Sequence, residues 1–227
     1  MFDTAKSEVL KNALIFSSLN DKELAEIAER AVERSFRAGE FVFWEDDPPD
    51  YFYVLLEGNV KVVKHSSSGK DFVVAFFSPG DMFGEVAVFE NKPYPASAQA
   101  VNEVKVLAIN TDALLKFLSL HPQVAIRIIS VLGGRLRESQ SRLRDIASEK
   151  VEQRIARTLL MLSDKLGNTL PFTRQEIADM TGTTTETAIR VMSRLKEGGI
   201  ISSVRGQIVI LDEAKLKLLS EGPPRVD

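Results

Sequence analysis

One face of a predicted helix between residues 185 and 197 carries the polar side chains best suited to a chemical task. They are Glu186, Thr187, Arg190 and Arg194. Carboxylate and guanidinium groups can contact the edges of DNA bases, and hydroxyl and guanidinium groups can contact phosphates. The opposite face of the same helix would be apolar and would pack on its own domain. These residues therefore favour DNA binding, although a two-helix corner of an ordinary helical domain would show the same periodicity.

The rest of the chain offers little that would support catalysis. It contains no cysteine and only two histidines, so thiolate nucleophiles, disulfides and cysteine-ligated iron–sulfur clusters are excluded. The histidines, His65 and His121, are far apart in the sequence and are interpreted as structural or solvated. The acidic run at residues 45–47 lies in a proline-bounded turn and is interpreted as a solvated loop. We therefore predict no catalytic residue, no metal site and no enzymatic activity.

Two helices and a hairpin must position the polar face. Thr173 and Glu176 have the spacing of a capping box for a first helix, and Gly182 allows a sharp turn before the second. This arrangement predicts a helix-turn-helix. Two short apolar runs around Arg205-Gly206 then predict a β-hairpin, which would make the domain a winged helix. Arg205 would contact phosphate at the tip of this wing, or would be a solvated turn residue.

The preceding parts of the chain have two other patterns. Residues 36–109 contain many short β-runs separated by Gly, Pro and Asp, which predict an antiparallel barrel or jelly roll, with short amphipathic helices over residues 7–35. A long helix is predicted from about Pro122 to Ala147. Its apolar positions recur at the spacing of a coiled coil: Ile129, Leu132, Leu136, Leu143 and Ile146. These residues predict a homodimer, although a helix packed only on its own domain would also need an apolar stripe.

The expected fold class is α+β, with three parts along the chain. Residues 1–120 would form an effector-sensing β-barrel domain with flanking helices, residues 121–147 the dimerisation helix, and residues 148–227 the winged-helix domain. A hinge is expected near Ala147-Ser148. The chain lacks an apolar run of the ~20 residues that a membrane span needs, and its first residues do not have the pattern of a signal peptide. We expect a cytoplasmic location and no membrane partner.

Four segments follow one another along the chain: AGE (38–40), LLEGNVKVV (55–63), SPGDMFGEVAVFE (78–90) and TRQEIADMTGTTTETAIR (173–190). In this order and spacing they resemble the cyclic-AMP receptor protein and fumarate-nitrate regulator family of bacterial transcription factors. The resemblance covers essentially the whole chain. It implies a homodimer that binds a pseudo-palindromic, double-stranded DNA operator, with half-sites about one helical turn apart, and it implies RNA polymerase as a further partner.

Within the recognition helix, the resemblance assigns roles to individual residues. Glu186 and Arg190 match the family's Glu-x-x-x-Arg pair, which would contact one G·C pair. Thr185 stands where the cyclic-AMP receptor type has an arginine, and Ile189 stands where the fumarate-nitrate type has a serine, so the flanking bases should differ. The remaining candidates for DNA contact, mostly with phosphates, are Thr173, Arg174, Thr184, Thr187, Arg194 and Arg205.

The resemblance also implies an effector site in the barrel. Family members that bind cyclic nucleotide use an FGE segment and an Arg-Ser pair to hold the phosphate and ribose, and a polar pair on the long helix to meet the base. The corresponding residues here are Phe83, Gly84, Glu85, Tyr94, Ser97, Ser139 and Gln140. Tyr94-Pro95 replaces the Arg-Ser pair, and neither residue can neutralise a phosphate. Lys92 is a poorly aligned substitute, so cyclic nucleotide is disfavoured.

The sequence leaves the identity of the effector unknown. The PYPASAQA segment (93–100) is similar to the corresponding region of the family's nitric-oxide-responsive branch. This keeps haem open as a cofactor, with His65 or His121 as the axial ligand. An altered cyclic-nucleotide site, a small hydrophobic or acidic metabolite, and the absence of any ligand also stay open.

Overall fold

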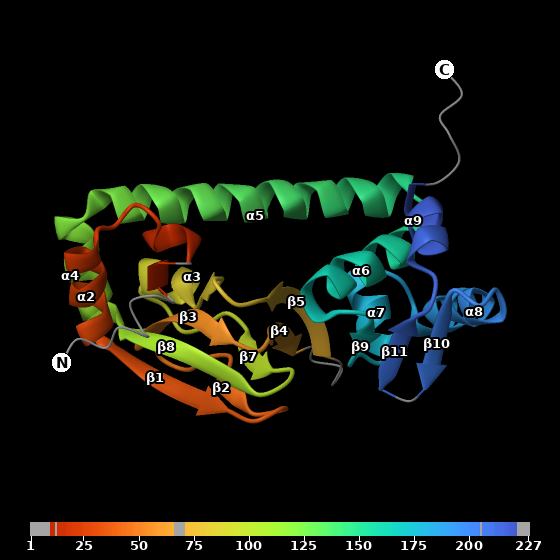
Figure 1. The fold of residues 1–227 in the computed structure, drawn as a ribbon, viewed down its shortest axis with the longest axis horizontal. Coiled ribbons are helices and arrows are strands. Elements are labelled where there is room, and N and C mark those ends of the chain that lie inside the picture. Colours follow the sequence, from red (N-terminus) through yellow and green to blue (C-terminus); the bar gives the residue numbers. More distant parts are fainter. Residues whose placement is uncertain (1–9, 12, 66–70, 205, 222–227) are drawn as a thin grey trace, which may run out of the picture. The chain divides into compact units, whose positions relative to one another are not determined.

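The computed structural model describes residues 10–11, 13–65, 71–204 and 206–221. Its internal contacts divide the chain into two units, residues 1–136 and 137–227 (Figure 1). The α+β class is confirmed, with an N-terminal β domain, a long helix and a C-terminal winged helix. The proposed domain boundaries at 120 and 147 stay a prediction.

Two antiparallel four-stranded sheets build the first unit, in the orders β1-β8-β3-β6 and β2-β7-β4-β5. Their strands are β1 (Ala31–Phe36), β2 (Phe41–Phe43), β3 (Tyr51–Glu57), β4 (Val60–His65), β5 (Asp71–Phe77), β6 (Met82–Phe83), β7 (Ser97–Ala100) and β8 (Val104–Asn110). Side chains alternate between the two faces of each strand. Tyr53 and Leu55 of β3 thus join residues of both sheets in one buried cluster, as the predicted barrel requires.

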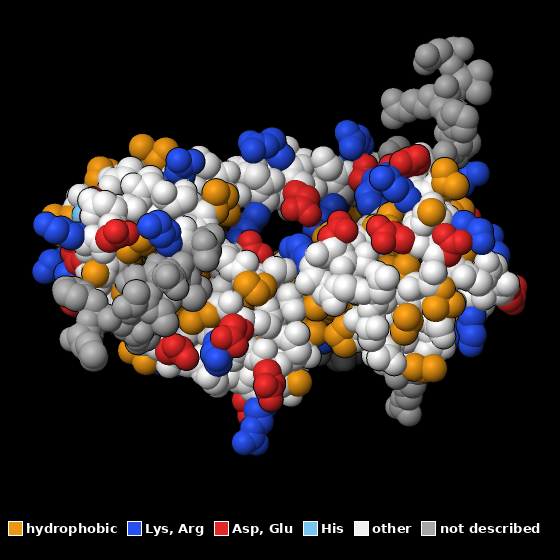
Figure 2. Space-filling model, viewed as in Figure 1, with side chains coloured by type: hydrophobic (Ala, Val, Ile, Leu, Met, Phe, Trp, Pro, Cys, Tyr) orange, Lys and Arg blue, Asp and Glu red, His pale blue; other side chains and the backbone are white. Residues whose placement is uncertain are grey.

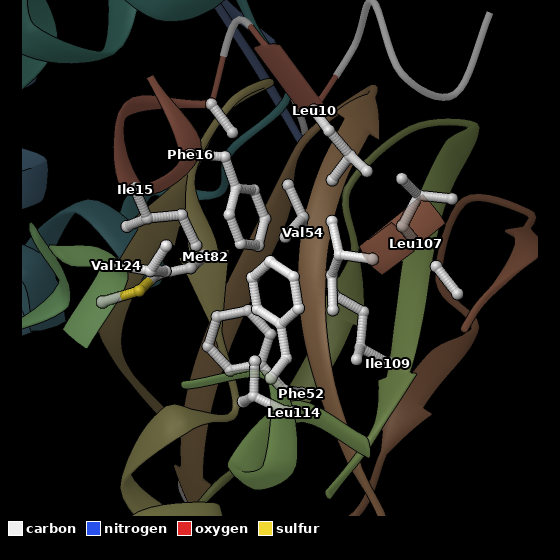
Figure 3. Close-up of a cluster of buried hydrophobic side chains, with 14 of the residues drawn as sticks. Leu10, Ile15, Phe16, Phe52, Val54, Met82, Leu107, Ile109, Leu114 and Val124 are labelled. Carbon is white, nitrogen blue, oxygen red and sulfur yellow. The ribbon is translucent and has the colours of Figure 1, made fainter. Parts of the chain in front are cut away.

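The neighbouring residues of β3 face a second core, which helices cover. Phe52 and Val54 pack with Phe16, Leu114 and Val124, which come from the helical segments around the sheet (Figure 3). These segments are the 3-10 helix at Leu14–Phe16, α2 (Asp21–Glu29), α3 (Glu85–Glu90), α4 (Thr111–Leu120) and the first part of α5 (Pro122–Ser148). This layer fixes the start of α5 to the β domain.

The second unit contains the rest of α5 and the winged helix. Its elements are α6 (Val151–Leu166), β9 (Thr169–Leu170), α7 (Arg174–Thr181), α8 (Thr185–Glu197), β10 (Ile201–Val204), β11 (Gln207–Ile210) and α9 (Glu213–Glu221). The capping box of Thr173 and Glu176 is present at the start of α7, and Gly182 ends this helix in the left-handed conformation with φ 63°. Strands β10 and β11 form the predicted antiparallel hairpin.

Among the residues that the structure describes, no single helix is long and apolar enough to span a membrane. Helices α4 and α5 pass by length and composition only when taken together, and they are bent by 111°.

Candidate DNA-binding surface and effector site

Helix α8 presents the predicted polar face to solvent because its other face is buried. The apolar residues Ala188, Val191, Met192 and Leu195 form the buried side of the helix. Glu186, Arg190 and Arg194 are exposed on the other side. Ile189, the position expected to differ from the fumarate-nitrate type, is 38% exposed and lies on the accessible surface as well. The structure thus brings together on one accessible surface Glu186, Ile189, Arg190 and Arg194, whereas Thr187 is half-buried.

The threonines expected at phosphates serve first as helix caps. Thr173 Oγ1 accepts from the backbone N of Glu176 at 3.2 Å, and Thr184 Oγ1 accepts from the backbone N of Thr187 at 3.3 Å. Each cap fixes the first turn of its helix, where backbone N–H groups and the helix dipole favour an anion. Arg174 is half-buried beside the first cap. Arg205 lies outside the described residues.

Thr185 has a partner that the sequence did not suggest. Its hydroxyl donates to Oε1 of Gln175, and Nε2 of Gln175 donates to Oδ1 of Asp179 at 2.7 Å. This chain of hydrogen bonds ties the start of α8 to α7. Gln175 and Asp179 stand four residues apart on one helix, which was the available signal for their contact. The resulting network indicates that Thr185 positions the recognition helix.

Two of the predicted effector residues of the barrel, Phe83 and Tyr94, lie in a stack of aromatic rings. The ring centroids of Phe43 and Tyr94 are 3.8 Å apart, with planes inclined by 14°. Tyr53 stacks on Phe83 at 5.1 Å, and Phe77 stacks on Phe83 at 5.6 Å. Tyr94 and Phe83 are 2% and 1% exposed. Aromatic carbon therefore occupies the part of the barrel where the resemblance implied a phosphate cradle.

The hydroxyl groups of this region are engaged within the barrel. Tyr94 Oη donates to the carbonyl O of Tyr51 and accepts from the N of the same residue at 3.3 Å. Burial raises the pKa of Tyr94, so the phenol stays neutral. Ser97 Oγ accepts from the backbone N of Glu45 at 2.8 Å and lies 3.0 Å from Nε2 of His65. These contacts leave little polar capacity for a new ligand at either side chain.

An arginine that sequence reasoning missed lies beside Glu85. Nη1 of Arg135, on α5, is 2.9 Å from Oε1 of Glu85, and its Nη2 donates to the carbonyl O of Met82 at 2.6 Å. The guanidinium also lies over the ring of Phe77, 4.7 Å from its centroid. Burial raises the pKa of Glu85, and the charge of Arg135 opposes this shift. Because 50 residues separate the pair, no local pattern indicated it.

Other residues near the predicted cradle have different roles. Lys92 pairs with Glu90 and its side chain is 70% exposed, so it does not replace the missing cation. Gly84 has φ 81°, and a Cβ there would lie 3.2 Å from Cδ2 of Tyr53. The glycine therefore permits both the turn and the close aromatic packing. Ser139 and Gln140 are exposed on the part of α5 that belongs to the second unit.

The apolar residues predicted for the dimer interface are mostly exposed in the single chain. Ile129, Leu136 and Leu143 are 66%, 60% and 69% exposed. Leu132 is half-buried against the core of the first unit, and Ile146 is 45% exposed. Large apolar side chains exposed at coiled-coil spacing are typical of helices that pair with a partner, and the dimer interface stays a prediction.

The distribution of charged side chains favours DNA binding less clearly than the exposed polar face of α8 does. Figure 2 shows acidic and basic side chains interspersed on the visible face of residues 137–227, and basic side chains along α5. Among the described residues, no group of three or more His, Cys, Asp or Glu side chains could hold a metal ion.

Comparison with known proteins matches both parts of the chain. Residues 33–121 match the model of the cyclic nucleotide-binding domain, and residues 153–219 match the model of the Crp-like helix-turn-helix domain. The chain is 28% identical to the CRP-like cAMP-activated global transcriptional regulator of Mycobacterium tuberculosis, over 92% of this chain and 97% of that protein.

Two further relatives support the same assignment. The nitrogen fixation regulation protein FixK of Bradyrhizobium diazoefficiens is 29% identical, over 93% of this chain and 91% of that protein. The structure of a CRP/FNR-family transcriptional regulator from Thermus thermophilus matches with a TM-score of 0.69 and 30% identity, over 84% of this chain and 99% of that one. Proteins of this family are DNA-binding regulators and not enzymes, which confirms the expectation that the chain has no catalytic role. The chain belongs to the CRP/FNR family of transcription regulators.

Proposed function

We propose that the protein is a homodimer that binds a pseudo-palindromic operator through α8 and responds to an effector other than cyclic AMP. The observation that carries the DNA-binding proposal is the exposed pair Glu186 and Arg190 on a helix that is capped and buried on its other side. Arg190 would donate to O6 and N7 of a guanine, while Glu186 would accept from N4 of the paired cytosine.

Dimerisation would supply the second recognition helix. Ile129, Leu136 and Leu143 would pack against the same residues of a second copy, which would bury their exposed side chains. A two-fold dimer matches the two-fold symmetry of a pseudo-palindromic operator. RNA polymerase is the further partner that we propose for the DNA-bound dimer, and the cytoplasm is its proposed location.

The proposal on the effector rests on the aromatic stack. The relative from M. tuberculosis is named as cAMP-activated, but in this chain Tyr94 and Pro95 stand where a phosphate would need an arginine and a hydroxyl. A cyclic phosphate at this position would face the neutral, already hydrogen-bonded phenol of Tyr94. The described cations near this region already have partners: Arg135 pairs with Glu85, Arg34 lies over the ring of Tyr51, and Lys64 donates to the carbonyl O of Pro95 and pairs with Glu45.

Haem is disfavoured by the surroundings of the two histidines. Nδ1 of His121 lies 3.2 Å from Glu23, and its Nε2 lies 3.3 Å from Glu26. Nε2 of His65 faces Ser97. A haem ligand would have to leave these contacts, so we propose that neither histidine binds iron.

Three experiments test the proposal. In vitro selection from random DNA should yield a palindromic sequence with one constant G·C pair in each half-site, and Arg190→Ala should lose this preference. Calorimetric titration with cyclic AMP should give no binding heat, and the absorption spectrum after haem supplementation should lack a Soret band. Submillimolar cyclic AMP affinity, or a stoichiometric Soret band, would overturn the effector part while leaving the DNA-binding part intact.

A further inference from the structure

One arginine joins the end of the long helix to the turn that precedes the recognition helix. Nη1 of Arg154, on α6, donates to the carbonyl O of Ile146 at 3.3 Å and of Glu149 at 2.9 Å. Its Nε donates to the carbonyl O of Thr181 at 3.0 Å, and its Nη2 to that of Gly182 at 3.3 Å. A single guanidinium therefore satisfies carbonyl groups on both sides of the expected hinge and in the helix-turn-helix itself.

A direct packing contact is part of the same joint, by which we mean the junction between residues 146–149, at the end of α5, and the turn at Thr181-Gly182. A Cβ placed on Gly182 would lie 2.9 Å from Cδ1 and 3.2 Å from Cγ1 of Ile146. The last apolar residue of the predicted dimer stripe on α5 thus lies against the turn between α7 and α8. This contact involves the side chain of Ile146, whereas Arg154 bonds the carbonyl groups of Ile146 and Gly182, so two kinds of contact bring the turn against the end of the long helix.

Ion pairs of Arg157, on α6, also hold the end of α5. Nη1 of Arg157 lies 2.8 Å from Oδ2 of Asp145, and its Nη2 lies 2.9 Å from Oε1 of Glu149. The Arg157 side chain is 46% exposed, so solvent screens these pairs. The bonds of Arg154 go to backbone carbonyls and depend on the fork geometry of a guanidinium, which lysine lacks.

We propose that Arg154 is a positioning residue that makes DNA binding selective for the spacing between half-sites. This inference rests on the proposed dimeric binding to an operator. If α5 pairs with its copy, a rigid joint at Arg154 carries the geometry of that pair to both recognition helices. One added base pair displaces a half-site by ~3.4 Å and rotates it by roughly 35°, and a rigid dimer must strain to follow it. A loose joint would tolerate the change.

The test uses full-length protein and the operator selected by the wild type. A series of duplexes changes only the number of base pairs between the half-sites, and binding is measured by fluorescence anisotropy. We expect the wild type to lose at least about tenfold in affinity for one added base pair, and Arg154→Lys and Arg154→Ala to lose about twofold or less. Affinity for an isolated half-site, which reports only local contacts, should change little.

Arg142→Ala is the matched control. This substitution also deletes one positive charge, but on α5, where Arg142 pairs with Glu138 one turn earlier in the same helix, and it should keep the wild-type spacing dependence. Ile146→Ala loosens the other contact of the joint and should broaden the spacing dependence as the Arg154 variants do, which covers the case in which those variants fold poorly.

The possible results separate the two levels of inference. An unchanged spacing penalty in folded Arg154→Lys and Ile146→Ala proteins would overturn the role of Arg154 and leave operator binding by a dimer intact. A wild type that selects no palindromic site, or that is indifferent to spacing, would instead contradict the proposed dimeric binding, and the inference would fall with it.

Discussion

Arg135 and Glu85 form a partly buried ion pair between the long helix and the β domain, with 2.9 Å between Nη1 and Oε1. The side chain of Glu85 is 8% exposed and that of Arg135 is 27% exposed. By resemblance to the family members that bind cyclic nucleotide, this glutamate would hold a ribose hydroxyl. Here it already has a charged partner, so a ligand that used Glu85 would have to share or displace Arg135.

This pair gives a pH-dependent prediction for Glu85→Gln. Burial raises the folded-state pKa of Glu85 above the usual value, so the protonated form is relatively favoured by folding. The stabilising contribution of protonated Glu85 is complete at pH values below the pKa of Glu85 in the unfolded chain. It is lost as the pH rises through the raised pKa of Glu85 in the folded protein. We therefore expect the wild type to lose stability relative to the glutamine variant as pH increases through this range.

Urea unfolding of both proteins at a series of pH values measures the difference in the free energy of unfolding. The two should converge at acidic pH, where both side chains are neutral. If the wild type instead gained stability relative to the variant with rising pH, the attraction of Arg135 would outweigh the cost of burial. Glu138→Gln, which also removes one negative charge but from a side chain that is 57% exposed, serves as a control for the change in net charge.

Arg190→Ala and Arg194→Ala should weaken DNA binding in different ways. Loss of a base-contacting arginine should cost about 1–3 kcal/mol and relax the preference at one base pair. Loss of a phosphate-contacting arginine should weaken binding to all sequences alike and reduce the salt slope by about one. Anisotropy titrations on the selected operator and on a duplex with that G·C pair changed measure both effects. Equal discrimination by Arg190→Ala and the wild type would contradict the assignment.

Leu143→Glu should convert the dimer to a monomer. The Leu143 side chain is 69% exposed in the single chain, so the substitution should not harm the fold, whereas two opposed glutamates would repel in a coiled coil. Leu218→Glu, in α9, changes an equally exposed leucine away from the stripe and should remain dimeric. Sedimentation velocity distinguishes the two states. If the Leu143→Glu variant remains dimeric, as the Leu218→Glu variant should, the dimer interface lies elsewhere.

Local rules predicted the elements of the DNA-binding part well. The capping box of Thr173 and Glu176 and the left-handed Gly182 follow from short-range geometry, which the sequence expresses within a few residues. The hydrophobic period likewise identified the buried face of α8. What the sequence did not reveal was that Thr185 bonds Gln175 of the preceding helix, because a contact between helices depends on how they cross.

In the effector region, by contrast, the sequence revealed which residues are present but not which residues they contact. The replacement of the Arg-Ser pair by Tyr94 and Pro95 was visible in the sequence, and it already disfavoured a phosphate at this segment. The stacking of Tyr94 on Phe43 and the pairing of Glu85 with Arg135 were not visible. Each joins residues about 50 positions apart, and their meeting depends on the closure of the two sheets and on the path of α5.

Gly182→Ala should destabilise the second unit by two separable effects. An alanine at φ 63° costs about 1–2 kcal/mol because its Cβ approaches the following carbonyl. The new Cβ would also meet Cδ1 of Ile146 at 2.9 Å unless the long helix or the side chain shifts. Ile146→Ala removes the atoms that it would meet. In the Ile146→Ala background, Gly182→Ala should therefore cost only the backbone part, and a double-mutant cycle of urea unfolding free energies gives the difference. If the effects of the two substitutions are additive, the turn at Gly182 does not press on Ile146. The packing contact would then no longer support a rigid joint, and the hydrogen bonds of Arg154 would be the only basis for it.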